Sequence, residues 1–176
     1  MIPHHATALN LSSVLEHQAS LTPDRVAITF AGESMTYGEL NAGAAQVAGG
    51  LGSLGITPGE HIALSCPNVP WFPLAYFGIL KAGAVVVPLN VLLKPREIAY
   101  HLKDSDAKAM LAFEGTADLP LAAMAKAACD EAGSQQLLVM TLAPDAPSPV
   151  AGAQTLTQAM LAADPAPFQT HRRRMV

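Results

Sequence analysis

Two patterns of hydrophobic residues recur along the chain, one with helical spacing and one of short, uninterrupted apolar runs. The longest helical pattern covers residues 37–54 and is followed by Gly55, a typical C-terminal stop; its apolar positions are Leu40, Ala44, Val47, Ala48, Leu51 and Leu54. The clearest apolar run is 84–87, which follows an apolar helix predicted at 70–82 and closes at Pro88. A strand without polar alternation is typical of a sheet covered on both faces, so this run predicts a parallel sheet.

The same patterns predict a regular succession of elements in the rest of the chain. A first helix begins after Asn10 or Ser12, either of which can cap it, and it ends at Thr22-Pro23. Two short strands, 26–30 and 35–36, are expected to form a hairpin. The further predicted elements are strands at 61–65, 108–112 and 137–142, a helix from Pro95 to about Asp104, and a helix from Leu119 to Glu131 with Asp118 as its candidate cap. This repeated β–α order predicts an α/β fold, in which helices pack on a parallel-rich sheet.

Composition divides the chain into two parts. Residues 1–143 carry the strands of the expected sheet and are predicted to form one α/β subdomain. Residues 144–176 are rich in proline and are interpreted as a connector, with room for a short helix at 155–163 and with a basic tail at 171–174. We find no internal repeat that would indicate a solenoid.

The bulk composition is typical of a globular protein, and the net charge bears on which kinds of partner are expected. Of the 176 residues, 51% are hydrophobic and 14% are charged, which argues against disorder. The net charge of −4 gives no reason to expect nucleic acid binding. Cys66 and Cys129 lie on different predicted elements and are interpreted as buried free thiols. The N-terminus shows no basic stretch followed by an apolar run, so no signal peptide is predicted and a cytoplasmic location is expected.

The stretch 71–93 is apolar enough to suggest a membrane span. Lys81 lies near its centre, where burial in lipid would cost about 3 kcal/mol. Pro73, Gly83 and Pro88 also interrupt it. We therefore predict a buried helix–strand unit and no transmembrane segment.

Several residues have both a functional and a structural interpretation, and their surroundings favour the structural one. The glycines at 50–55 match G-x-G-x-x-G, but they close a helix instead of opening one, so a dinucleotide site is not expected. Thr36 and Glu39 form the T-x-x-E pattern of a helix capping box. Lys81 falls in the last turn of a helix, where it is expected to offset the helix dipole and extend its amine to water. His101 is interpreted as a surface or packing residue rather than a base.

Two segments carry a resemblance to a known family. Thr36-Tyr37-Gly38-Glu39-Leu40 and, about forty residues later, Leu80-Lys-Ala-Gly-Ala-Val-Val-Val-Pro-Leu-Asn90 resemble the first two core motifs of the AMP-forming acyl-adenylate synthetases. The similarity extends from about Asn10 to Glu114. Residues 88–108 look more like bacterial fatty-acid–CoA ligases than peptide-synthetase adenylation domains. The resemblance implies the N-terminal subdomain of an acyl-adenylate-forming enzyme fold.

The resemblance also implies a reaction for the intact enzyme. Such an enzyme joins a fatty acid or other carboxylate to ATP, with Mg²⁺ on the phosphates, and then transfers the acyl group to coenzyme A. The family's phosphate loop and its C-terminal lysine find no match before Val176. We therefore assign no catalytic, cofactor-binding or metal-binding residue and no cofactor to this chain. We expect a truncated reading frame whose product is inactive alone.

Two other functions stay open at this stage. One is a stand-alone α/β module that binds a nucleotide or an acyl group. The other is a structural or interaction fragment whose open sheet pairs with another chain. Because the expected strands need cover on both faces, we also expect the fragment to associate with itself.

Overall fold

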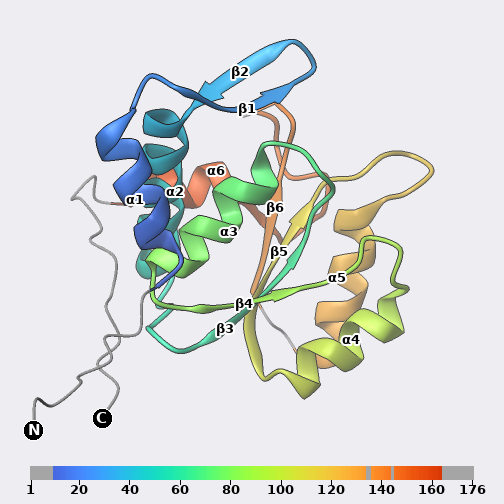
Figure 1. The fold of residues 1–176 in the computed structure, drawn as a ribbon. Coiled ribbons are helices and arrows are strands. Elements are labelled where there is room, and N and C mark those ends of the chain that lie inside the picture. Colours follow the sequence, from blue (N-terminus) through green and yellow to red (C-terminus); the bar gives the residue numbers. More distant parts are fainter. Residues whose placement is uncertain (1–9, 134–135, 144, 164–176) are drawn as a thin grey trace, which may run out of the picture.

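The computed structural model describes residues 10–133, 136–143 and 145–163 (Figure 1). The helices of this part are α1 Ser12–Leu21, α2 Tyr37–Ser53, α3 Trp71–Lys81, α4 Pro95–Asp104, α5 Leu121–Ala132 and α6 Leu156–Ala162. The strands are β1 Val26–Phe30, β2 Glu33–Thr36, β3 His61–Ser65, β4 Val85–Pro88, β5 Ala107–Phe113, β6 Gln136–Met140 and β7 Gln154–Thr155. Residues 1–9 and the basic run 171–174 lie outside the described residues.

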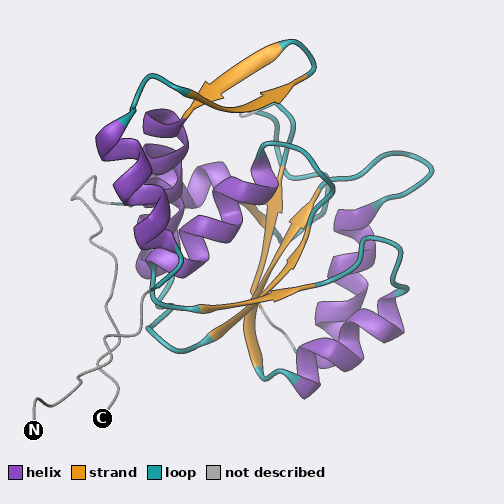
Figure 2. Cartoon of the chain, in the orientation of Figure 1, coloured by secondary structure: helices purple, strands orange, loops and turns teal. Residues whose placement is uncertain are grey.

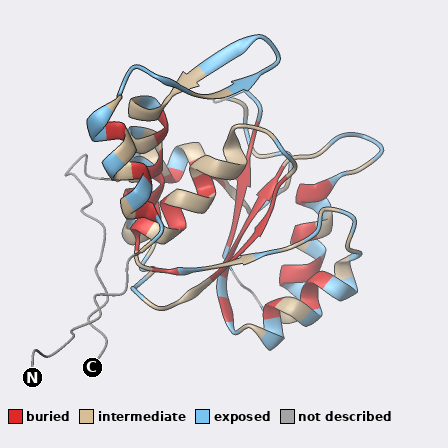
Figure 3. Cartoon of the chain, in the orientation of Figure 1, coloured by how far each residue is buried: buried red, intermediate tan, exposed pale blue. Residues whose placement is uncertain are grey.

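The main sheet has five parallel strands in the order β4-β3-β5-β6-β7. Helices cover both of its faces (Figure 2). Along β3, Ile62 and Leu64 pack into the cluster formed with α2, α3 and α6, whereas Ala63 packs into the cluster formed with α4 and α5. The central strands are accordingly buried on both sides (Figure 3). The prediction of an α/β fold with a parallel sheet is confirmed.

A smaller N-terminal unit packs beside this three-layer body. Strands β1 and β2 pair antiparallel as the predicted hairpin. Leu15 of α1 packs with Leu40 and Ala44 of α2, and apolar residues of the hairpin cover this small cluster. Helix α2 therefore packs both against the N-terminal unit and against one face of the main sheet.

Close helix contacts depend on two glycines. An added Cβ at Gly78 of α3 would overlap the side chain of Val47 on α2. An added Cβ at Gly50 of α2 would lie 3.0 Å from the carbonyl carbon of Ala159 and from the nitrogen of Met160, both in the backbone of α6. The absence of a side chain at Gly50 is what lets α6 approach α2.

Some predicted boundaries were wrong. Asp118 does not cap α5, which begins at Leu121 after Pro120 and has no side-chain cap. The strand predicted to reach Leu142 ends at Met140. At the start of α1 the N-cap position is Leu11 rather than Asn10 or Ser12, and it makes no side-chain cap bond. The side chain of Asn10, one residue earlier, accepts a hydrogen bond from the Ser12 nitrogen at 3.0 Å.

The apolar stretch 71–93 forms helix α3 and strand β4, as predicted. Across the described residues, every helix is too short or too polar to cross a lipid bilayer. Further along, residues 154–162 form β7, which pairs with β6, and α6, which packs on α2.

Candidate functional site

The order of the strands marks one place where a ligand site is expected. Strand β3 is followed by α3 on one face of the sheet, and β5, the neighbour of β3, is followed by α5 on the other face. In open α/β sheets, ligands bind outside the carboxyl ends of the strands at such a reversal. We call this region the carboxyl edge, formed by residues 65–71, 113–120 and 140–142.

Two side chains at the carboxyl edge hold one peptide group. The indole Nε1 of Trp71 donates a hydrogen bond to the carbonyl oxygen of Thr141, at 2.8 Å. The backbone nitrogen of the next residue, Leu142, donates to Oε1 of Glu114, at 2.7 Å. The side chain of Trp71 is partly buried. Sequence reasoning missed Glu114 and Thr141, because no local pattern links residues so far apart.

The N-terminus of α3 lacks the donors that a phosphate site needs. Phosphates bind helix N-termini through unpaired backbone N–H groups of the first turn. In α3, Pro70 and Pro73 have no N–H group, and the Phe72 nitrogen already donates to Val69 at 2.9 Å. This helix end therefore offers few donors to an anion.

The N-terminus of α5 is occupied in a similar way. Pro120 has no N–H group. The Leu121 nitrogen donates to the backbone carbonyl of Leu119 at 2.9 Å, and the Ala122 nitrogen donates to the backbone carbonyl of Glu114 at 3.2 Å. Helices α3 and α5 flank the reversal of the sheet. The described first turns of α3 and α5 therefore offer few backbone donors to a nucleotide phosphate at this reversal.

The cysteines are buried free thiols, as predicted. Cys66 lies at the carboxyl edge, just after β3, and burial raises its pKa to about 12. Burial likewise raises the pKa of Cys129, on α5, to about 11, with the charge of Asp130 adding to the effect. A thiol acts as a nucleophile only as the thiolate, so neither is activated for catalysis.

The glycine-rich segment ends a helix, as predicted. Gly55 follows α2 with φ +84°, and the Ile56 nitrogen donates to the Leu51 carbonyl at 3.1 Å. The capping box at the other end of α2 is also confirmed. The Glu39 nitrogen donates to Oγ1 of Thr36 at 3.2 Å, and the Thr36 nitrogen donates to Oε2 of Glu39 at 2.8 Å. The hydrogen bonds that the backbone nitrogen and the hydroxyl of Thr36 donate to the Glu39 carboxylate lower the pKa of that carboxyl.

Lys81 is structural, but it does not extend to water as expected. Its side chain is 2% exposed, and its Nζ donates to Oε1 of Glu16 on α1 at 2.5 Å. Beside it, the side-chain nitrogen of Asn10 donates to the carbonyl of Leu80 at 2.7 Å. The pair fastens α1 to the C-terminal end of α3, where a cation also offsets the helix dipole.

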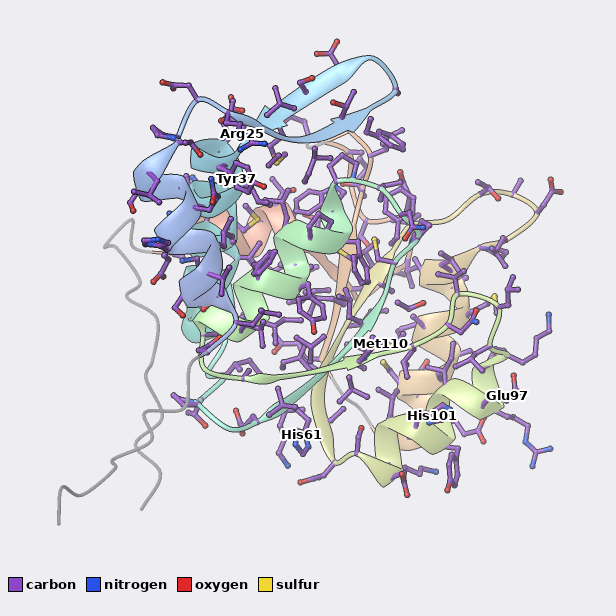
Figure 4. All side chains as sticks on the ribbon, viewed as in Figure 1. Arg25, Tyr37, His61, Glu97, His101 and Met110 are labelled. Carbon is purple, nitrogen blue, oxygen red and sulfur yellow. The ribbon has the colours of Figure 1, made fainter. Side chains whose placement is uncertain are left out.

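His61 and His101 lie on separate elements. His61 is on β3, with its Nδ1 2.5 Å from the carbonyl oxygen of Ser105, and His101 is on α4 with its ring against Tyr100 (Figure 4). Figure 4 also shows Glu97 on α4, where its Oε2 accepts a hydrogen bond from the backbone nitrogen of Lys94 at 2.7 Å. No three His, Cys, Asp or Glu side chains of the described residues lie close enough together to hold a metal ion.

A pocket of about 330 Å³ lies away from the carboxyl edge. It opens between α5 and the first residues of β6, next to β7; its lining residues are Lys126, Cys129, Asp130, Gln136, Leu137, Gly152 and Gln154. Lys126 and Asp130 pair across one turn of α5. The rest of the lining is uncharged amide, thiol or apolar surface.

Comparison with known proteins relates nearly the whole chain to one family. The family model described as "AMP-binding enzyme" matches residues 15–172. A long-chain-fatty-acid–CoA ligase of Bacillus subtilis is 32% identical over 115 residues, which are 64% of this chain and 20% of the ligase. One of the plipastatin synthase proteins of the same organism is 35% identical over 108 residues, 61% of this chain and 4% of the synthase.

Solved structures agree with this relationship. A benzoate CoA ligase from Burkholderia xenovorans is 28% identical with a TM-score of 0.75, over 94% of this chain and 31% of the ligase. The chain thus spans about a fifth of the B. subtilis ligase and less than a third of the benzoate ligase. Identity alone does not separate fatty-acid ligases from peptide synthetases, because both classes match at similar levels.

Proposed function

The chain belongs to the family of AMP-binding enzymes, and from this premise we propose that it is the N-terminal part of an ATP-dependent fatty-acid–CoA ligase. The observation that carries the proposal is the family match over residues 15–172, together with the fold shared with a benzoate CoA ligase. In the intact enzyme, a carboxylate would be adenylated by ATP and then passed to the thiol of coenzyme A.

A fatty acid is the substrate that we favour. The support for it is the segment 88–108, which looks more like the fatty-acid branch than like peptide-synthetase adenylation domains. Long-chain-fatty-acid–CoA ligases of B. subtilis and Salmonella typhimurium are among the relatives, at 32% and 39% identity, which is compatible with this substrate but does not single it out. We place the protein in the cytoplasm, where ATP and coenzyme A are available.

The described helix ends beside the sheet offer few donors to the phosphates of ATP. The first turns of α3 and α5 are occupied by prolines and by internal hydrogen bonds, and the described residues hold no three-ligand metal cluster. We therefore assign no catalytic step to this chain. We propose that its part is structural: it supplies the five-stranded sheet on which the rest of the enzyme would build its site.

Calorimetric titration of the chain with ATP–Mg²⁺, with a long-chain fatty acid and with coenzyme A tests this proposal. We expect no saturable heat with any of the three ligands. Tight, saturable binding of one ligand would instead favour a stand-alone binding module, for which the 330 Å³ pocket beside α5 is the observation in favour. Lys126→Ala, which alters that pocket, would then identify the site.

A further inference from the structure

The peptide group that joins Thr141 to Leu142 is held from both sides. Its carbonyl oxygen accepts from Trp71, the first residue of α3, and its N–H group donates to Glu114, the residue that follows β5. We propose that Trp71 and Glu114 are positioning residues that clamp this peptide group, and so fix where the chain leaves the carboxyl edge of the sheet. The proposal holds whether or not the chain is part of a ligase.

The clamp lies where the regular hydrogen bonds of the sheet end. Strand β6 stops at Met140, whose carbonyl still accepts from the Glu114 nitrogen at 2.9 Å. On the other side of β6, strand β7 pairs only at the level of Leu138 and Val139. The following peptide group is therefore held by side chains in place of a strand neighbour.

The position of Thr141 needs such a restraint. Thr141 is completely buried, and its hydroxyl has no hydrogen-bond partner among the described residues. Burying an unpaired hydroxyl opposes this placement. Leu142 next to it is 64% exposed, so its apolar side chain does not anchor the segment either. Among the described residues, the hydrogen bonds from Trp71 to the Thr141 carbonyl and from the Leu142 nitrogen to Glu114 hold this peptide group in place.

The clamp also joins segments that are far apart in sequence. Trp71 and Thr141 are separated by 70 positions, and Glu114 and Leu142 by 28. The three segments contribute the ends of β5 and β6 and the start of α3. Because both bonds act on one rigid peptide plane, breaking one should weaken the other.

Amide hydrogen exchange at Leu142, followed by NMR, tests the clamp directly. In the unmodified chain this amide should exchange slowly, although its side chain is exposed. Glu114→Ala should raise its exchange rate about tenfold to a hundredfold, the range for losing a hydrogen bond to a charged group. Glu114→Gln should keep most of the protection, because its amide oxygen can accept the same bond.

Trp71→Phe supplies the decisive comparison, since it removes the indole donor on the other side of the peptide group. It should raise the Leu142 exchange rate about twofold to tenfold. The increase in the double variant Trp71→Phe/Glu114→Ala should fall short of the product of the two single increases, because the bonds depend on each other. Thr141→Val is the matched control, because it removes the unpaired hydroxyl but no clamp bond, and it should not raise the rate.

Two results would overturn the proposal. One is fast exchange of the Leu142 amide in the unmodified chain, a measurement that needs no variant to fold. The other is an unchanged Leu142 rate in Trp71→Phe, with the amides of α5 still protected, since the two bonds would then act independently.

Discussion

Lys81 is held inside the protein by a carboxylate that lies 65 positions away in the sequence. Its side chain is 2% exposed and that of Glu16 is 33% exposed. Glu16→Gln leaves the buried ammonium group without its charge partner and should lower the free energy of unfolding by about 2 kcal/mol, less than for a fully buried pair because water reaches Glu16. Lys81→Met should cost less, because water can solvate the remaining carboxylate.

Chemical denaturation of these variants checks this prediction. Lys126→Met is the matched control, because it breaks the ion pair with Asp130 on the surface of α5. That pair should contribute at most about 1 kcal/mol. Equal losses in Glu16→Gln and Lys126→Met would contradict a special role for the buried pair.

The two thiols should be unreactive in the folded protein. Their raised pKa values, about 12 for Cys66 and about 11 for Cys129, leave roughly one thiolate in a thousand or fewer at pH 8. A thiol reagent such as 5,5′-dithiobis(2-nitrobenzoate) should therefore label both cysteines only after unfolding. Rapid labelling of the folded chain at pH 8 would contradict this expectation.

The same shift predicts how stability depends on pH. Unfolding returns the thiols toward the ordinary pKa of 9.0, so the unfolded state loses their protons first as the pH rises. The contribution of the protonated thiols to the free energy of unfolding is thus complete below about pH 9. It declines as the pH rises from there towards the pKa values of the folded state, about 11 and about 12. Cys66→Ala should flatten this decline between pH 9 and 12. An unchanged slope in that variant would show that other groups cause it.

At the scale of elements, α2 shows which parts of the fold the sequence can predict. Its beginning and its end are set by neighbours in sequence, the Thr36–Glu39 box and the glycine at 55, and both predictions are confirmed. The start of α5 was missed because the preceding loop supplies its own bonds, such as that from the Leu119 nitrogen to Oγ1 of Thr116. The end of β6 was missed because its determinants, Trp71 and Glu114, are remote.

The same distinction applies to the candidate site. The prediction that the glycines of α2 close a helix needed only local spacing. Locating the carboxyl edge required the order of the strands in the sheet, which no single segment of the sequence reveals. Predicting the burial of Lys81 would have required knowing that α1 packs on α3. What stayed hidden at sequence level was therefore tertiary pairing between distant residues.

The contact between α2 and α6 gives a test at this scale. In Gly50→Ala the new methyl group would press on the backbone of Ala159 and Met160, which cannot move aside as a side chain can. We expect a loss of about 1–3 kcal/mol in the free energy of unfolding. Gln46→Ala, at a position of the same helix away from this contact, should change stability by less than about 0.5 kcal/mol.

Thermal and denaturant unfolding of both variants measures this difference. If Gly50→Ala were as stable as Gln46→Ala, then α6 would not depend on the close approach. Neither Gly50→Ala nor Gly52→Ala should change affinity for a nucleotide, because these glycines end a helix. A selective loss of nucleotide binding in a folded variant would restore the dinucleotide interpretation.

At the scale of the whole molecule, exposed apolar side chains and open sheet edges predict self-association. Several large apolar residues are more than half exposed: Leu11 52%, Val14 59%, Leu21 63%, Leu142 64% and Leu161 80%. Strands β4 and β7 form the edges of the main sheet. Because exposed apolar patches and unpaired edges favour association, light scattering at micromolar concentration should detect dimers or larger species.

A charged variant provides the control for this prediction. Val14→Lys/Leu21→Lys places two charges on the exposed side of α1 and should shift the scattering toward the monomer. A monomeric unmodified chain that binds no hydrophobic dye would contradict the expected association and would favour an autonomous module.

ATP–pyrophosphate exchange with a long-chain fatty acid distinguishes an N-terminal scaffold from a complete enzyme. The chain is assayed alone and together with a separately produced B. subtilis long-chain-fatty-acid–CoA ligase that lacks the matched 115 residues. If the chain supplies the N-terminal scaffold but no catalytic residues, it should show no exchange alone and should restore exchange when the two pieces are mixed. Exchange by the repurified chain alone, or none from a mixture in which the pieces bind each other, would contradict it.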